Sequence, residues 1–374
     1  MIANFEAWKL SVNLTFTSIV DTNTGEILTK KRYDKIITTH RAKWETFDLI
    51  VKEVLNISIG KSIFHLTIKG SLHKNNYGGS NYLSFNWQQL HQQLNHICKT
   101  LCIDPRTAQI STLEIGVNIV TPFLVSPFLM DNIINYKGDP FTRYKKDNNG
   151  FCLGIYCSLT QYVIKIYDKG LQHRLPDNLM RFEKRFLKMQ VLNKLGIKFL
   201  VDLLDKDKIK NLLPMLLEAW QNVLIYDIED LKNISKKCNF KEEEIDLLHS
   251  GQNPKYWESL KKENKRQFNY HREKFKKLVA TNGNNWQKLV EGLIQNEWQN
   301  LFKNCTNLHS GENDKLYKLT IKINGKNVQN LFCQSCGNDI SKQKGGSNFC
   351  SPKFVGKVTA HHCRNNSSNP RNNL

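Results

Sequence analysis

Apolar and polar residues alternate in many segments of the first half of the chain, and a period of two predicts β-strands. The segments with this pattern are 8–16, 26–37, 62–72, 109–120, 150–158 and 162–186, the last read as two strands joined by a loop. Helical spacing occurs between them, at 85–103 and 127–136. We therefore expect an α+β domain over residues 1–190, with an antiparallel-rich β-sheet and packed helices.

From residue 187 the pattern becomes helical. Segments with apolar residues three and four positions apart are 198–228, 241–250, 256–280 and 285–302, and this spacing predicts amphipathic helices. We expect a helical domain over 191–310, a small module over 311–365 and a polar, disordered tail over 366–374. The helical half is large enough to support a homodimer.

The charge of the chain narrows the choice of partner. Among its 374 residues, 54 are Lys or Arg and 34 are Asp or Glu, which gives a net charge of +20. This excess favours a polyanion, with nucleic acid ahead of an anionic membrane. Cations alternate with aromatic residues at 261–277, so this helix is expected either to contact DNA or to present an ordinary solvated face.

Targeting and membrane-spanning signals are missing from the pattern. No stretch approaches the ~20 apolar residues of a spanning helix, and the N-terminal segment 1–16 lacks a basic region followed by an apolar one. We expect a soluble cytoplasmic protein, with no membrane partner.

Four of the ten cysteines are spaced as zinc ligands. They are Cys333, Cys336, Cys350 and Cys363. A close pair from a tight turn and a second pair from a hairpin suit a tetrahedral structural Zn²⁺ site. Since the second pair is widely spaced, His361 or His362 can replace Cys363 as the fourth ligand. The alternatives are four unrelated thiols or a disulfide, which a cytosolic compartment disfavours.

Side-chain alternation predicts one polar sheet face. In the predicted strands, apolar residues such as Ile164, Ile166 and Phe182 point to the core. The residues expected to share the opposite face, across four strands, are Lys165, Tyr167, Arg181, Glu183, Arg185, Glu114, Gly116, Asn118, His65, Thr67 and Lys69. Gly116 has no side chain and leaves room there.

This set of residues suits phosphodiester chemistry. Glu114 and Glu183, with the Asn118 amide, can hold Mg²⁺ or Mn²⁺, which prefer oxygen ligands. The Tyr167 oxygen can attack phosphorus once it loses its proton to the metal site or to a neighbouring base, while cations stabilise the developing charge. The alternatives are a sheet-edge tyrosine and carboxylates that only form ion pairs.

Four blocks resemble the phage and plasmid replication-initiation endonucleases related to the gene II protein of filamentous phages, and more distantly the Rep_trans plasmid initiators. In chain order they are "IKGSLHKNNYGGSN", "ISTLEIGVNI", "VIKIYDKGLQ" and "LMRFEKRFLKMQVLNKLGI". The resemblance implies a metal-dependent, site-specific DNA endonuclease and strand transferase. Such an enzyme nicks one origin strand, joins the 5′ phosphate and leaves a 3′ hydroxyl that primes rolling-circle replication.

The resemblance also assigns roles to residues. It implies Tyr167 as the nucleophile, Glu114 and Glu183 as metal-site carboxylates, and Lys169 and Arg181 as phosphate contacts. Further DNA contacts are expected from the glycine-rich loop and the polar strand face, namely Lys69, Ser71, Lys74, Lys165 and Arg185.

The resemblance implies that the protein acts in the cytoplasm of a bacterial host cell. The implied partners are origin DNA, as supercoiled duplex and as single strand, and the host helicase and polymerase. Two alternatives stay open: a conjugative relaxase on the same scaffold, and a non-catalytic origin-binding regulator. The lysines near the cysteines suggest that the zinc-ribbon-like module at 311–365 binds DNA too; the alternatives are a purely structural role and docking of another protein.

The zinc hypothesis gives a first prediction. The purified protein is expected to contain about one zinc ion per chain, and Cys336→Ser is expected to remove it, because a site with three ligands holds zinc far less tightly. Metal content is measured by atomic emission. Comparing Cys363→Ser with His361→Ala and His362→Ala identifies the fourth ligand; full zinc content in Cys336→Ser would contradict the site.

Overall fold

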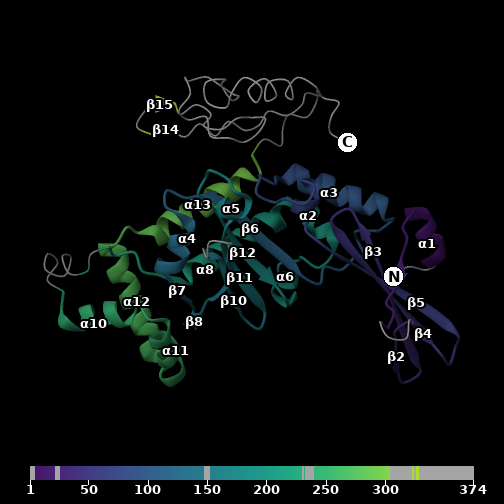
Figure 1. Cartoon of the computed structure of the whole chain (residues 1–374), viewed down its shortest axis with the longest axis horizontal. Coiled ribbons are helices and arrows are strands. Elements are labelled where there is room, and N and C mark those ends of the chain that lie inside the picture. Colours follow the sequence, from purple (N-terminus) through teal and green to yellow (C-terminus); the bar gives the residue numbers. More distant parts are fainter. Residues whose placement is uncertain are drawn as a thin grey trace. The chain divides into compact units, whose positions relative to one another are not determined.

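The computed structural model describes residues 5–21, 26–146, 152–229, 231 and 240–303, together with 322–323 and 326–327. The chain divides into two compact units, Met1–Thr306 and Asn307–Leu374 (Figure 1). In the second unit the described residues form a short antiparallel pair, β14 (Lys322–Ile323) with β15 (Lys326–Asn327). The predicted zinc ligands and the polar tail lie outside the described residues.

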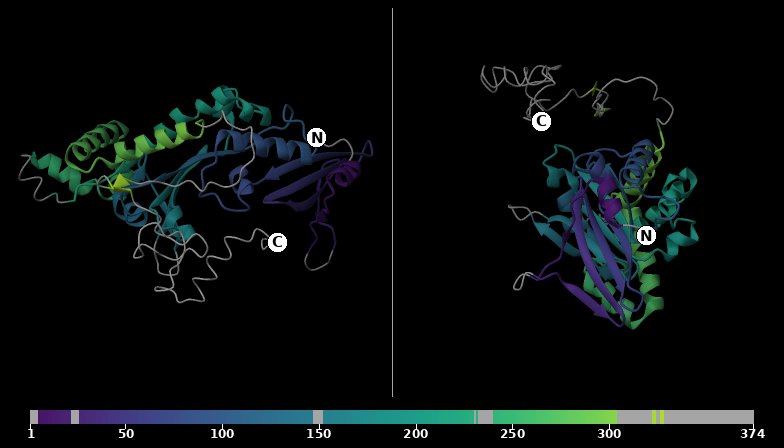
Figure 2. Two further views of the ribbon diagram at one scale, coloured as in Figure 1. Left: turned by 90° about the horizontal axis from the view of Figure 1, so that it is seen from above. Right: turned by 90° about the vertical axis from the view of Figure 1, so that its right-hand side faces the viewer.

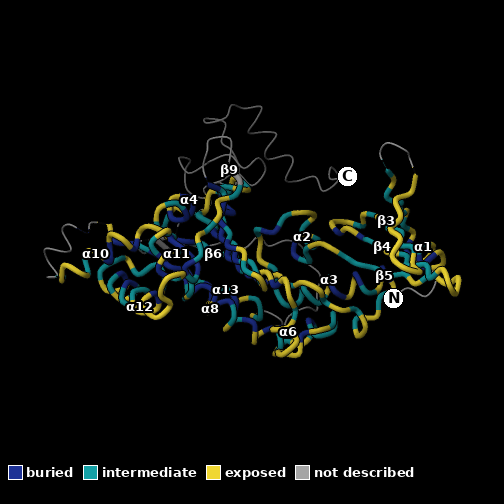
Figure 3. Tube along the Cα trace, turned by 90° about the horizontal axis from the view of Figure 1, so that it is seen from below, coloured by how far each residue is buried: buried dark blue, intermediate teal, exposed yellow. Residues whose placement is uncertain are grey.

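The first unit is built around a five-stranded antiparallel sheet, called here the central sheet. Its strands, in spatial order, are β6 (Leu113–Val120), β12 (Leu179–Phe186), β11 (Tyr162–Asp168), β10 (Cys152–Ser158) and β9 (Thr142–Lys146). The alternation predicted from sequence is confirmed, since Ile164, Ile166 and Phe182 are fully buried on one face. Burial is concentrated at this sheet, as the dark blue segments near β6 show (Figure 3).

Two helices of the second half cover the apolar face of the central sheet. They are α8 (Leu213–Gln221) and α13 (Trp286–Asn300), which contact β12 and β6. The Trp220 ring lies edge-on to Phe182, with centroids 5.3 Å apart, and its indole N–H donates to the Gln287 carbonyl at 2.8 Å. Sheet and helices therefore share one core, so the predicted boundary near residue 190 does not separate two cores.

A second sheet, the N-terminal sheet, is formed by residues before the central sheet. Its strands are β1 (Thr17–Ser18), β2 (Thr29–Arg32), β3 (Lys35–Trp44), β4 (Phe47–Asn56) and β5 (Lys61–Lys69), with the order β1-β3-β4-β5 and β2 also on β3 (Figure 2). Helices α1 (Phe5–Val12) and α3 (Trp87–Thr100) pack on one of its faces. The Trp8 indole N–H donates to the Leu101 carbonyl at 2.8 Å, which joins the start of the chain to the end of α3.

A third group of elements surrounds a small antiparallel sheet. The strands are β13 (Val223–Ile225), β7 (Ile133–Tyr136) and β8 (Asp139–Pro140), and the helices are α10 (Glu242–Ser250), α11 (Pro254–Glu263) and α12 (Lys265–Asn282). Trp257, Phe268 and Phe275 are buried together here. The aromatic residues that alternate with cations at 261–277 therefore serve mainly as core, and Tyr270 stays exposed.

Short elements complete the described chain. They are α2 (Leu72–Asn76), α4 (Val125–Pro127), a π-helical turn (Phe128–Asn132), α5 (Lys169–His173), α6 (Gln190–Lys194), a 3₁₀ turn (Leu200–Leu204) and α7 (Lys206–Lys210). In the part of the chain that the structure describes, no helix is long and apolar enough to span a bilayer.

Several sequence predictions were wrong in detail. The strand expected at 8–16 is mostly helix α1, because Phe5, Trp8 and Val12 lie on one helical face while Leu10 stays exposed. The helix expected at 127–136 ends in strand β7, and the helical stretch 198–228 ends in strand β13.

The predicted face of four strands was also wrong. β5 belongs to the N-terminal sheet, whereas β6, β11 and β12 belong to the central sheet. His65, Thr67 and Lys69 therefore do not share a sheet face with Tyr167. Strand alternation fixes which side chains share a face within a strand, but it does not specify the partner strand.

Phe182→Ala tests the shared core. We expect a loss of about 3–5 kcal/mol in the free energy of unfolding, because the ring is fully buried between the sheet and Trp220 and its removal leaves a cavity. Urea titration followed by tryptophan fluorescence measures the change. Leu10→Ala, at an 81% exposed position, is the control and is expected to change stability by less than ~0.5 kcal/mol.

Candidate functional site

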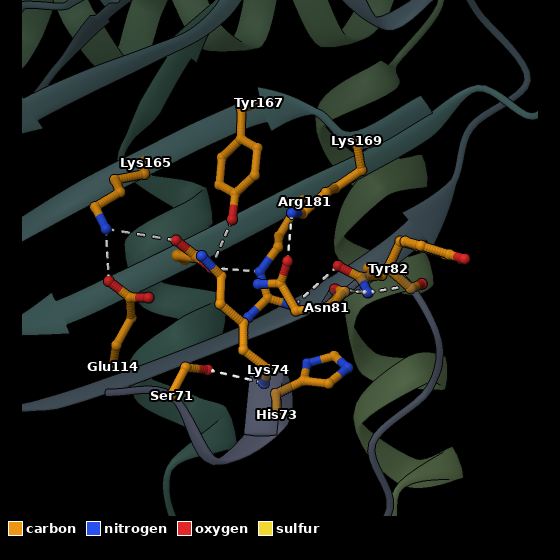
Figure 4. A network of polar contacts seen from close by, with 12 residues as sticks. Ser71, His73, Lys74, Asn81, Tyr82, Glu114, Lys165, Tyr167, Lys169 and Arg181 are labelled. Atoms are coloured by element: carbon orange, nitrogen blue, oxygen red, sulfur yellow. Dashed lines mark hydrogen bonds and ion pairs between the residues drawn. The ribbon is translucent and has the colours of Figure 1, made fainter. Parts of the chain in front are cut away.

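Three adjacent strands of the central sheet carry the polar residues of the candidate site. On β11 and β12, Tyr167 is the register partner of Arg181, and Lys165 is the partner of Glu183. β6 continues the rows, with Asn118 opposite Arg181 and Gly116 opposite Glu183. Antiparallel pairing thus places these side chains on the face opposite the apolar core. Figure 4 shows Lys165, Tyr167 and Arg181 side by side on this face.

Two glycines leave the space that these side chains occupy. A Cβ atom at Gly116 would lie 2.7 Å from Cγ of Glu183, and one at Gly154 would lie 2.5 Å from Cβ of Tyr167. Gly154 is the register partner of Tyr167 on β10. The room expected at Gly116 is therefore used by the Glu183 side chain itself.

A network of hydrogen bonds and ion pairs centres on Glu183. The Tyr167 hydroxyl donates to its Oε1 at 2.9 Å, and the Arg181 Nε–H donates to the same oxygen. Lys165 Nζ lies 3.6 Å from its Oε2 and donates to Glu114 Oε2 at 2.6 Å. Glu183 is only 2% exposed and Arg181 only 8%, although alternation alone predicted that both would point outward.

The segment that follows β5 covers this polar face. Asn118 Nδ2 donates to the backbone carbonyls of Asn81 and Tyr82, both at 3.0 Å, and its Oδ1 accepts from Arg181 Nη1 at 2.9 Å. A ring nitrogen of His73 on α2 lies 2.9 Å from the Leu83 carbonyl. The buried cluster is therefore closed by residues that precede the tyrosine by roughly 85 to 95 positions in the chain.

Lys169 lies beside the tyrosine because β11 ends in a capped turn. The Asp168 carboxylate accepts from the Leu171 N–H at 2.7 Å and begins α5, in which Lys169 is the first residue. Lys169 Nζ lies 5.1 Å from the centre of the Tyr167 ring and donates to Oδ1 of Asn81 and, at 2.9 Å, to Oε1 of Gln172. Lys169 is buried, at 2% exposure.

Burial and charge set the protonation of the cluster. Burial alone raises the pKa of the Glu183 carboxyl, but Arg181 and Lys165 together lower it below the ordinary value. The pKa of the Tyr167 phenol is raised by burial and by the negative charge of Glu183. At neutral pH the pair is thus a neutral phenol donating to an ionised carboxylate.

The predicted metal ligands are all engaged with protein groups. Glu114 and Glu183 both pair with Lys165, and the Asn118 amide is used at both ends. Two carboxylates here face three cations, Lys165, Lys169 and Arg181. Among the described residues, no group of three or more His, Cys, Asp or Glu side chains could hold a metal ion. The arrangement as it stands does not fit Mg²⁺ or Mn²⁺.

The predicted DNA contacts fall in different places. Lys165 lies in the network, whereas Ser71 acts as the N-cap of α2 and accepts from the Lys74 N–H at 3.3 Å. Lys74 and Arg185 are exposed. Lys69 is exposed on β5, in the N-terminal sheet.

Sequence reasoning missed the covering residues Asn81, Gln172 and His73 as part of the site. The signal that could have indicated Asn81 was the loop rich in glycine and asparagine at 75–81, which was associated with phosphate rather than with Tyr167. Burial, with Arg181 and Lys169 nearby, lowers the pKa of His73 to about 3. His73 is therefore a neutral hydrogen-bonding group of the cover.

Comparisons of the chain with protein-family models, with curated proteins and with solved structures gave no match. The similarity to replication endonucleases therefore remains a prediction based on the four sequence blocks.

His73→Gln is expected to make the free energy of unfolding less dependent on pH below neutrality. Because the folded chain keeps His73 neutral while the unfolded chain binds a proton below pH ~6.5, wild-type stability is full above that pH and falls below it. The side-chain amide of glutamine can replace the ring N–H toward the Leu83 carbonyl without titrating.

The measurement is urea unfolding at several values between pH ~7 and ~5, a window above the range in which Glu183 gains its proton. In the wild type, protonation of His73 on unfolding is expected to lower the free energy of unfolding by up to ~1.4 kcal/mol for each unit that the pH falls. We expect this contribution to the slope to be absent in the variant. His249→Gln, at an exposed position, is the control. An unchanged slope in His73→Gln would show that His73 does not titrate as described.

Proposed function

We propose that this protein nicks one strand of a phage or plasmid origin through Tyr167 and so initiates rolling-circle replication. The observation that carries the proposal is the hydrogen bond from the Tyr167 hydroxyl to Glu183, made beside Arg181, Lys165 and Lys169. A nucleophile held by a carboxylate base and flanked by phosphate-binding cations is the arrangement that phosphoryl transfer to a tyrosine requires.

The proposed step conserves atoms and charge. The Tyr167 oxygen forms a bond to phosphorus, and its proton passes to Glu183, which already accepts its hydrogen bond. The bond between phosphorus and the 3′ oxygen breaks, and that oxygen leaves with a proton taken from Lys169 or from water. The products are a 5′ phosphotyrosyl link and a free 3′ hydroxyl.

Phosphate binding would prepare the base. In the absence of DNA, Arg181 and Lys165 lower the pKa of Glu183, which makes it a weak base. A phosphate that draws these cations to its own oxygens relieves that effect, so the carboxylate becomes a better acceptor for the phenol proton. Chemistry would then depend on DNA being bound.

The position of Lys165 opposes the binding of a divalent cation in this site. Mg²⁺ or Mn²⁺ would have to replace Lys165 between Glu114 and Glu183, because that ammonium group now lies between the two carboxylates. The nicking assay with and without a chelator tests whether the proposed reaction needs a metal ion.

A non-catalytic DNA-binding regulator is the second candidate. The observation that favours it is the cover over the network, since Arg181 and Glu183 are buried and Asn118 is fixed to the backbone at Asn81 and Tyr82. In that case the cluster only stabilises the fold. Attack by Tyr167 on DNA requires the cover to open when DNA binds.

Tyr167→Phe separates the two candidates. We expect the wild-type protein to convert supercoiled plasmid carrying the origin into open circles with covalently attached protein, and the variant to form none, because phenylalanine has no oxygen to attack phosphorus. Denaturing gels that retain protein-linked DNA measure the outcome.

The matched control is Tyr162→Phe on the same strand. Alternation places Tyr162 on the opposite, core-facing side, where its hydroxyl lies 3.2 Å from that of Tyr136. This control is expected to nick normally. If all three proteins bind the plasmid and none nicks it, the proposed endonuclease function is wrong and the non-catalytic regulator is supported.

A further inference from the structure

The N-terminal sheet has two unlike faces. One face packs its apolar residues, among them Phe47, Leu49 and Val51, against α1 and α3. Strand pairing defines the other face residue by residue, because register partners share a side of the sheet. Across the far end of the sheet, Arg32, Lys35, Asn56 and Lys61 form one row.

We call this second side the basic face. Continuing the register along the strands places eight cations on it: Lys30, Arg32, Lys35, Arg41, Lys43, Lys52, Lys61 and Lys69. All eight are exposed. The strand residues of this face include one carboxylate, Asp48, which lies 3.7 Å from Lys43. Within the described residues, none of the other seven cations has a carboxylate within 4.0 Å.

We propose that the basic face binds the phosphate backbone of duplex DNA. Eight exposed cations around one carboxylate repel one another, and a polyanion relieves that repulsion while releasing its own counterions. The assignment rests on the proposed function only in taking DNA as the polyanion. It does not depend on the chemistry at Tyr167.

The dimensions of the basic face match a duplex. Ten-residue strands such as β3 and β4 extend over ~30 Å, and neighbouring strands lie ~4.8 Å apart. A ~30 Å length of duplex carries ~18 phosphates, so several can meet cations of the face at once. Exposed and half-buried residues follow one another along these strands (Figure 3).

The composition of the face favours duplex over single strand. Its strand residues include no Phe, Tyr or Trp, whereas proteins that bind single strands stack bases on such rings. Among its apolar members, Ile37 and Val54 are half-buried and Ile63 is 47% exposed. An anionic membrane would be bound through a broad set of inserting apolar side chains; the exposed strand residues of this face are mainly cations, so we favour DNA.

The basic face is also connected to the candidate site along the chain. β5 ends at Lys69, and only Gly70 and Ser71 separate it from α2, whose His73 covers the buried cluster. A Cβ atom at Gly70 would lie 2.3 Å from the Phe47 ring, so the chain turns closely over the core there. Duplex held on the basic face is thereby linked through a short, tightly packed connection to the cover over Tyr167.

The test neutralises three cations of the face together. Full-length protein with Arg41→Gln, Lys52→Gln and Lys61→Gln is titrated against two short duplexes of unrelated sequence, using fluorescence anisotropy at salt concentrations from ~50 to ~200 mM. We expect the slope of log affinity against log salt to fall in magnitude by about 3, and both duplexes to be weakened by the same factor, because the lost contacts are to phosphate.

A variant with the same loss of charge elsewhere is the control. Lys188, Lys194 and Lys198 are exposed around α6, and their replacement by glutamine is expected to leave the slope nearly unchanged. Urea unfolding of both triple variants confirms that they fold. Equal slopes for the two would overturn the proposal, and so would loss of binding to anionic vesicles without loss of binding to duplex.

Failure of this inference can be distinguished from failure of the proposed function. All titrations are repeated in the Tyr167→Phe background, which cannot form a covalent link. If the basic face is correct, the triple variant weakens binding there too, whatever the nicking assay shows. If the wild-type protein nicks but the face variant binds normally, the enzyme stands and the DNA-binding surface lies elsewhere.

Discussion

The contact between Glu183 and Arg181 is the interaction on which the candidate site depends. Both groups are buried on the polar face of the central sheet, where an unpaired charge would cost several kcal/mol. Arg181 also holds Asn118, whose amide fixes the backbone that covers the cluster. The same carboxylate holds the Tyr167 hydroxyl. One ion pair therefore orients the tyrosine and its cover together.

This ion pair also belongs to a network that is covered by other parts of the chain and that keeps Tyr167 neutral. The phenol is protonated and the carboxylate is compensated, because Arg181 and Lys165 lower the pKa of Glu183. In the proposed reaction, an entering phosphate would compete for those cations, so binding and activation of the base would be coupled by charge. Such coupling would restrict phosphoryl transfer to bound DNA.

The two sheets of the first unit use positive charge in opposite ways. In the central sheet, Arg181 and Lys165 form ion pairs with carboxylates and are largely shielded from water. In the N-terminal sheet, the cations of the basic face are exposed and largely unmatched. The first arrangement provides precise local geometry and the second provides long-range attraction. The proposed function would use both arrangements, one to hold DNA and the other to act on a single phosphodiester bond.

The sequence by itself determined which side chains share a face of one strand, because alternation is local: Ile164 and Ile166 point one way, and Lys165 and Tyr167 the other. Charge and composition likewise came from the sequence alone. Only the tertiary structure decided that β5 pairs in a separate sheet and that Asn81 closes over Arg181. These depend on contacts between segments far apart in the chain, whose pairing is selected by the packing of the whole core and leaves no local period to read.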